Sequence, residues 1–202
     1  MGDINLGTKL KNLNEDVNTK IDEVSSVIAD NGDWLKSKNL YNNSTMYSDW
    51  LNNAGALHSL NNNEIEVVCS SDNYSGINIV SNKFNELFSG LNGKTITLSA
   101  KIKSSANSNI QFGVTSGGRV NYNLNTNYIE VKQTFTLDTS KNNNHFCIYK
   151  VGADTSIFTI KDIQIELGTE ATPYTPYVKS NVELESDLAT LIETLKSKGV
   201  ID

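Results

Sequence analysis

Residues 157–177 read IFTIKDIQIELGTEATPYTPY, and this stretch decides the fold. Its first half alternates as a strand does, with Ile163, Ile165 and Leu167 on one face and polar side chains on the other. Its second half cannot pair in a sheet, because Pro173 and Pro176 lack a backbone donor and keep the preceding residue extended. They are the only prolines of the chain, so we expect them to mark the exit from a sheet domain.

The alternation changes parity inside this stretch. Phe158 and Ile160 are apolar at even positions, whereas Ile163 and Ile165 are apolar at odd ones. One extra residue near 161–162 would place the apolar side chains before and after it on the same face of the sheet, because the side chains of a strand alternate with a period of two. The pattern predicts a β-bulge, or a strand that leaves one sheet for cover by another layer.

Other alternating segments predict an antiparallel sandwich. They cover residues 65–69, 77–79, 96–102, 110–114, 129–137 and 146–149, the last being apolar on both faces. Turns rich in Asn, Gly and Ser separate them, and we expect no helical crossover, which favours antiparallel pairing. Residues 116–119, SGGR, predict a hairpin turn that carries Arg119 outward.

Several short motifs also resemble a known family. They are Asn39-Leu40-Tyr41, Trp50, KTITLSA at 94–100, DIQIE at 162–166 and ATPYTPY at 171–177. Together they resemble the jelly-roll, carbohydrate-binding-module-like domains of phage tail fibres, baseplate proteins and related prophage proteins of Gram-positive hosts. The resemblance covers residues 39–177. It implies a mainly β chain, a jelly roll over 39–177, host adhesion through cell-wall polysaccharide, and assembly in the bacterial cytoplasm into a virion.

Two amphipathic segments flank the expected sandwich, at 1–38 and 178–202. Apolar residues recur at steps of three and four, and we take them as oligomerisation residues: Leu6, Leu10, Leu13, Val17, Ile21, Val24, Ile28, Leu184, Leu188, Leu191 and Leu195. Each narrow stripe favours a coiled coil of like helices over packing on the sandwich, which stays the alternative. The resemblance implies a homotrimer, while the stripes alone leave a dimer open. We expect the fibre axis to enter the sandwich at one end and to continue at the other.

Composition excludes several kinds of partner. A net charge of −6 and a pI near 5.0 argue against nucleic acid and anionic membranes. No apolar run is long enough to insert in a membrane, and the N-terminus lacks the pattern of a signal peptide. Cys69 and Cys147 fall in apolar runs and predict buried thiols, with a disulfide as the alternative.

Binding fits the sequence better than catalysis. No catalytic or metal motif stands out, so we expect no enzyme and no cofactor, although loop residues such as Asp72 leave a structural calcium open. A sugar site combines an aromatic ring with a few placed polar groups. Two clusters fit that description, the first being Arg119, Tyr122, Asn123 and Tyr128, and the second Asp72 and Tyr74.

Three functions remain open on this basis. The first is a receptor-binding segment of a phage tail that holds wall polysaccharide. The second is a purely structural fibre or adaptor domain that contacts other tail or baseplate proteins, with the same tyrosines serving as strand-end packing residues. The third is the binding module of a wall-degrading enzyme, which the two flanking helices make less favourable.

Overall fold

The computed structural model describes residue 19 and residues 39–42, 47–179 and 181–199. The helix expected over 1–38, with its oligomerisation residues Leu6 to Ile28, lies outside these ranges except for Thr19. Lys38–Tyr177 form one compact unit, and the residues from Val178 onward belong to a second.

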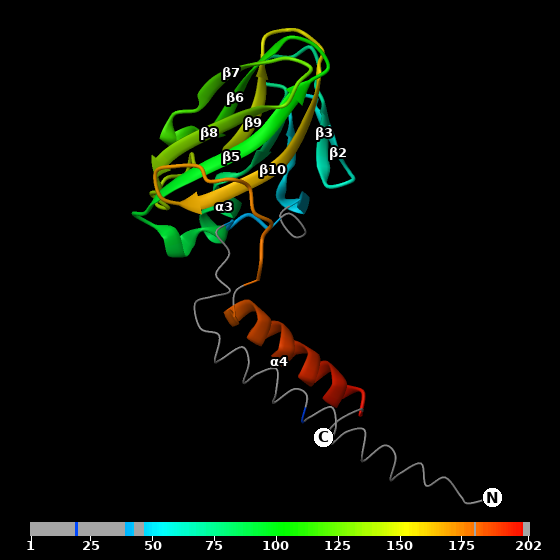
Figure 1. Ribbon diagram of the computed structural model, residues 1–202, viewed down its shortest axis with the longest axis vertical. Coiled ribbons are helices and arrows are strands. Elements are labelled where there is room, and N and C mark those ends of the chain that lie inside the picture. Colours follow the sequence, from blue (N-terminus) through cyan, green and yellow to red (C-terminus); the bar gives the residue numbers. More distant parts are fainter. Residues whose placement is uncertain (1–18, 20–38, 43–46, 180, 200–202) are drawn as a thin grey trace, which may run out of the picture. The chain divides into compact units, whose positions relative to one another are not determined.

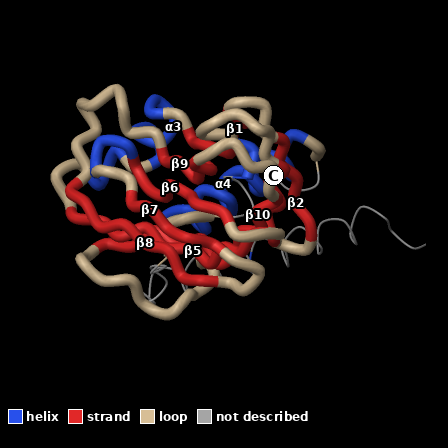
Figure 2. Tube along the Cα trace, turned by 90° about the horizontal axis from the view of Figure 1, so that it is seen from above, coloured by secondary structure: helices blue, strands red, loops and turns tan. Residues whose placement is uncertain are grey.

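Ten antiparallel strands build the first unit as a sandwich of two sheets (Figures 1 and 2). Sheet A has the order β1-β4-β9-β6-β7, and sheet B has the order β2-β3-β10-β5-β8. The strands are β1 (Leu51–Asn53), β2 (Leu57–Asn61), β3 (Glu64–Val68), β4 (Gly76–Ile79), β5 (Thr95–Ser104), β6 (Ser108–Val114), β7 (Val120–Leu124), β8 (Ile129–Thr136), β9 (Phe146–Val151) and β10 (Ile157–Leu167).

The path of the chain from β3 to β10 is that of a jelly roll. It changes sheet at every connection except the hairpin from β6 to β7, which gives the four-strand orders β4-β9-β6-β7 and β3-β10-β5-β8. The predicted antiparallel sandwich is therefore confirmed. The inner faces meet in a core of fully buried aliphatic and aromatic residues that includes Ile77, Phe112, Phe146, Ile148, Leu98, Ile102 and Phe158.

One short helix was not expected. α3 (Ser81–Leu87) follows β4, and its buried Phe84 packs near Phe88 and Phe146, with ring centroids 4.9 and 6.2 Å away. It continues into the 3-10 turn η3 (Ser89–Leu91). Other 3-10 turns are η2 (Tyr47–Asp49), before β1, and η4 (Thr115–Gly117), which closes the predicted hairpin between β6 and β7.

The predicted bulge in β10 is confirmed. Its pairing with β5 shifts register between Lys161 and Gln164, and Asp162 takes a φ of 53°, a left-handed conformation that Asp tolerates. Phe158 and Ile160 before the shift and Ile163 and Ile165 after it all face the core. The extra residue thus keeps one strand apolar on a single face along its whole length.

The bulge is also where β10 changes neighbour. Before it, residues 157–160 of β10 pair with β3. After it, the amide of Leu40 donates to the carbonyl of Ile165 at 2.7 Å, and buried Asn39 bonds the backbone at Ile163 and Ile165. Asn39 Nδ2 also donates to the carbonyl of Thr175 at 3.1 Å. The sandwich therefore begins and ends at one place, and the expectation of entry and exit at opposite ends is wrong.

The remaining expectations concern the second unit and the thiols. α4 (Asn181–Ser197) confirms the C-terminal helix; Leu184, Leu188 and Leu195 are half-buried, and Leu191 is 51% exposed. Association through these residues stays a prediction.

Among the described residues, no helix is long and apolar enough to span a membrane. Cys69 and Cys147 are buried and free, so the disulfide alternative is wrong.

Candidate functional site

The outer face of sheet A gathers polar and aromatic side chains that the strand register places together. Asn78 lies opposite Cys147, and Tyr149 lies between Gly76 and Gln111. Directly opposed residues point to the same face of a sheet, and the alternate positions of these strands fill the core. We call this surface the sheet A face.

Two loops fold over Tyr149. Tyr74 comes from the β3–β4 loop, and its ring centroid lies 6.5 Å from that of Tyr149 in an edge-to-face arrangement. Arg119, from the β6–β7 turn, places its guanidinium carbon 5.7 Å from the Tyr74 centroid and 5.5 Å from the Tyr149 centroid. Tyr149 is only 9% exposed, whereas Tyr74 is 41% exposed. One aromatic ring is thus held in place, and a second is open to solvent.

A hydrogen bond fixes the buried ring, and burial keeps the Tyr149 phenol and the Cys147 thiol uncharged. Asn78 Nδ2 donates to the Tyr149 hydroxyl at 2.8 Å. Burial raises the pKa of the Tyr149 phenol and also that of the neighbouring Cys147 thiol, although Arg119 partly opposes both shifts. Both groups are therefore protonated at neutral pH, and neither is an activated nucleophile or a general base.

Two acceptors on this face lack a donor. The side-chain oxygens of Asn78 and Gln111 are buried and make no hydrogen bond to the protein. A buried oxygen without a donor costs about 1–3 kcal/mol, and such groups in proteins are normally satisfied by protein or ordered water. A ligand hydroxyl or a water molecule placed there would supply the missing donor.

Exposed amides extend the face across the outer strands. Asn109 on β6 lies opposite Asn123 on β7, and Asn121 lies opposite Gln111. The three asparagines are exposed. An amide both donates and accepts, so this row can bond hydroxyl groups in either direction.

The structure brings together part of the predicted site. Arg119 and Tyr74 meet on the sheet A face, and Asn123 shares it. Asp72 lies in the same loop as Tyr74, where its carboxylate accepts from Ser70 Oγ at 3.3 Å.

The other two predicted residues lie elsewhere. The Tyr122 ring packs against the core, and its hydroxyl bonds the backbone N–H and carbonyl of Lys132 at 2.8 and 2.7 Å. Tyr128 lies against sheet B, with Lys103 and Lys161 over its ring at 4.6 and 4.1 Å from the centroid.

Sequence reasoning missed Tyr149, Gln111 and Asn78. Residues 146–149 are apolar on both faces, so the pattern could not tell which parity points away from the core. The available clue was that Cys147 and Tyr149 share a parity opposite to that of Phe146 and Ile148.

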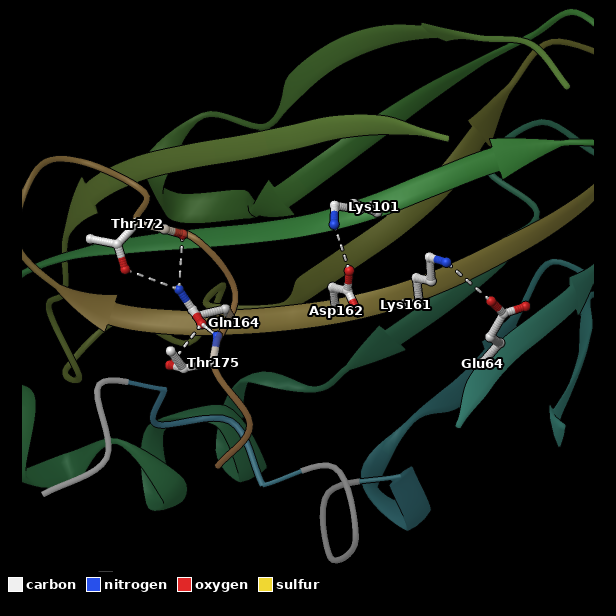
Figure 3. Close-up of polar contacts among 7 residues, drawn as sticks. All are labelled: Glu64, Lys101, Lys161, Asp162, Gln164, Thr172 and Thr175. Atoms are coloured by element: carbon white, nitrogen blue, oxygen red, sulfur yellow. Dashed lines mark hydrogen bonds and ion pairs between the residues drawn. The ribbon is translucent and has the colours of Figure 1, made fainter. Parts of the chain in front are cut away.

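The outer face of sheet B is the other polar surface, and it carries two ion pairs (Figure 3). Lys101 binds Asp162 at 2.8 Å and Lys161 binds Glu64 at 3.6 Å. Burial, followed by the nearby Glu64 carboxylate, raises the pKa of Tyr128 to about 12. A cavity of about 390 Å³ lies between Lys101, Asp162 and residues 171–174. Within the described ranges, no group of three or more His, Cys, Asp or Glu residues could hold a metal ion.

The chain matches no protein-family model and no curated protein. Among solved structures, the C-terminal family 22 carbohydrate-binding module of Clostridium thermocellum Xyn10B is similar over 67% of this chain and 97% of that module, with 11% identity and a TM-score of 0.46. A CBM4 module is similar over 60% and 96%, with 14% identity and a TM-score of 0.43. The CBM22-1 xylan-binding domain of Paenibacillus barcinonensis Xyn10C is similar over 60% and 87%, with 9% identity and a TM-score of 0.40. These neighbours are carbohydrate-binding modules, and at these scores the likeness assigns neither a family nor a ligand to this chain.

Proposed function

We propose that the sheet A face binds polysaccharide and that the chain is a non-enzymatic host-recognition segment of a phage tail fibre or baseplate. The observation that carries the binding proposal is the meeting of Tyr74, Tyr149 and Arg119 on the face that also holds the unpaired buried oxygens of Asn78 and Gln111. The tail assignment rests on the motifs of residues 39–177 described above.

The chemistry of the face suits a sugar polymer. An exposed ring such as Tyr74 offers a flat apolar surface to the C–H face of a pyranose, while amides and a guanidinium bond its hydroxyls. Fixing Tyr149 with Asn78 and Arg119 lowers the entropy that binding must overcome, because the ring is ordered in advance. Each site would bind weakly, and a trimer of the whole chain would raise the avidity.

A structural adaptor is the second candidate, and a different surface favours it. Leu57, Val68 and Ile157 lie opposite one another across β2, β3 and β10 and point outward. They are 66%, 44% and 39% exposed. Adjacent exposed apolar side chains are typical of protein contacts, so this patch would face another virion protein. The same binding chemistry also fits a module of a wall-degrading enzyme.

The test is removal of the exposed ring. We expect Tyr74→Ala to weaken binding to purified Gram-positive wall polysaccharide about three- to tenfold, because one aromatic contact is worth about 0.5–1.5 kcal/mol. Co-sedimentation with the insoluble polymer, over a series of protein concentrations, measures the change. Tyr128→Ala is the matched control, since it removes a half-buried tyrosine from the β7–β8 loop, which lies against the other sheet. Equal affinity of the Tyr74→Ala variant and the unaltered chain would contradict the proposal.

A further inference from the structure

Arg119 is held in a position where its charge is not neutralised. Its guanidinium lies over two tyrosine rings and beside the Cys147 thiol, and its side chain is half-buried. None of the ion pairs among the described residues involves it. Tyrosine faces attract a cation but do not cancel its charge.

Charge is distributed very unevenly between the two sheets. The strands of sheet A contain no Asp or Glu, and their single charged residue, Lys150, points inward. The strands of sheet B carry nine charged residues: the carboxylates Glu64, Glu66, Glu130, Asp162 and Glu166 and the lysines Lys101, Lys103, Lys132 and Lys161. The chain as a whole has a net charge of −6. On the sheet A face, an acidic group of a ligand would therefore find the cation Arg119. No carboxylate on the strands of that sheet would repel it.

The carboxylates in the neighbouring loops accept hydrogen bonds from serine side chains. Asp72 accepts from Ser70 Oγ at 3.3 Å, and Asp154 accepts from Ser108 Oγ at 3.0 Å. Asp154 also lies next to the buried Lys150, whose ammonium donates to its carbonyl. Asp72 is thus bonded within its own loop and Asp154 to the start of β6, and neither forms an ion pair with Arg119 among the described residues.

We propose that the saccharide bound at the sheet A face carries an acidic group, a carboxylate or a phosphate, and that this group pairs with Arg119. The inference rests on the proposed function and names the class of its ligand. A guanidinium offers a planar fork of donors that matches both anions in two parallel hydrogen bonds. The two tyrosine rings hold that fork in one plane, so little side-chain entropy is lost when the anion binds.

The first experiment compares polymers that differ only in charge. Isothermal titration of the unaltered full chain would use polygalacturonate against its fully methyl-esterified form, for carboxylate, and phosphomannan against neutral mannan, for phosphate. We expect the acidic member of at least one pair to bind about tenfold more tightly, since a hydrogen bond to a charged group is worth about 1.5–3 kcal/mol. The ratio should shrink as salt is added, because a partly exposed ion pair is screened.

The second experiment assigns that preference to one side chain. Arg119→Met should weaken binding of the acidic polymer much more than binding of the neutral one, so that the ratio of the two affinities falls towards one, while Arg119→Lys should keep part of the preference. Lys132→Met removes an equal charge from the outer face of sheet B and should change neither. Thermal unfolding of each variant checks that the sandwich is intact, and Arg119→Lys supplies the test if Arg119→Met does not fold.

The outcomes separate this inference from the proposed function. Equal affinity for the acidic and neutral members of both pairs, no binding of any acidic polymer, or a preference that persists in Arg119→Met would overturn the acidic ligand. If neutral polymers bind and Tyr74→Ala weakens them, polysaccharide binding at the sheet A face stands without the acidic group. If Tyr74→Ala alters no binding at all, the proposed function fails together with the inference.

Discussion

Lys150 is a charged residue inside the core, and its surroundings explain why. It is fully buried on the inward face of β9, where its Nζ donates to the carbonyl of Gly152 at 2.7 Å and to the carbonyl of Asp154. Gly152 has a φ of 111°, a conformation that favours glycine and lets the chain turn back over the ammonium. The ammonium thus holds the β9–β10 loop closed, much as a bound cation would.

We expect Lys150→Met to lower the free energy of unfolding by about 2–4 kcal/mol, because two carbonyl oxygens lose their donor. Relief of the cost of burying a charge offsets part of the loss. Urea unfolding followed by circular dichroism measures the change, with Lys132→Met as the exposed control. An unchanged midpoint for Lys150→Met would mean that water replaces the ammonium at no cost.

At the scale of elements, the segment after β10 acts as a strap on the outer face of sheet B. Gln164 is fully buried although it points away from the core, because its amide accepts from the Thr175 N–H at 2.8 Å and donates to the Thr172 carbonyl at 3.2 Å (Figure 3). Glu166 accepts from the Thr172 N–H at 3.0 Å and from its hydroxyl at 2.5 Å. Side chains of β10 therefore supply the partners that a neighbouring strand would give to residues 172–175.

Gln164→Ala should release this strap. We expect a loss of about 2–3 kcal/mol in the free energy of unfolding, since both hydrogen bonds disappear from a buried site, and faster amide hydrogen exchange at 172–175. Thr159→Ala, on the same face near the start of β10, is the control. If exchange at 172–175 stays slow in Gln164→Ala, Glu166 alone holds the strap.

Period-two alternation explains which elements the sequence predicts well. The long strands, the bulge and the β6–β7 hairpin follow from it, because one face of each is apolar and the other is mostly polar. β1, β2 and α3 escape such analysis: β1 is Leu-Asn-Asn, β2 is mostly exposed at the edge of sheet B, and α3 has only seven residues.

The candidate site was harder to predict for a related reason. Its inner residues, Cys147 and Tyr149, are covered by loops from elsewhere in the chain and so look like core. The Tyr74–Arg119 contact depends on two turns that the fold alone brings together. Tyr122 was misleading, because its setting between two asparagines is that of a strand whose tyrosine faces inward and packs against the core.

At the scale of the whole molecule, association is the property left to test. Leu191 on α4 is 51% exposed in a single chain, while Leu184, Leu188 and Leu195 are half-buried. An exposed leucine in such a stripe favours contact with another copy. We expect Leu191→Asp to lower the oligomeric mass of the full chain in multi-angle light scattering. Thr190→Asp, on a neighbouring exposed position, should not. A monomeric unaltered chain at micromolar concentration would exclude the trimer.

The contact between Asn39 and Thr175 has a consequence for how such a chain can change over time. Because the Asn39 side chain donates to the carbonyl of Thr175, the two ends of the sandwich lie at neighbouring points. A gene segment for residues 39–177 could be exchanged for another sandwich whose two ends also lie side by side without altering the distance between its points of attachment. The sandwich would in that sense be an inserted domain that recombination can replace.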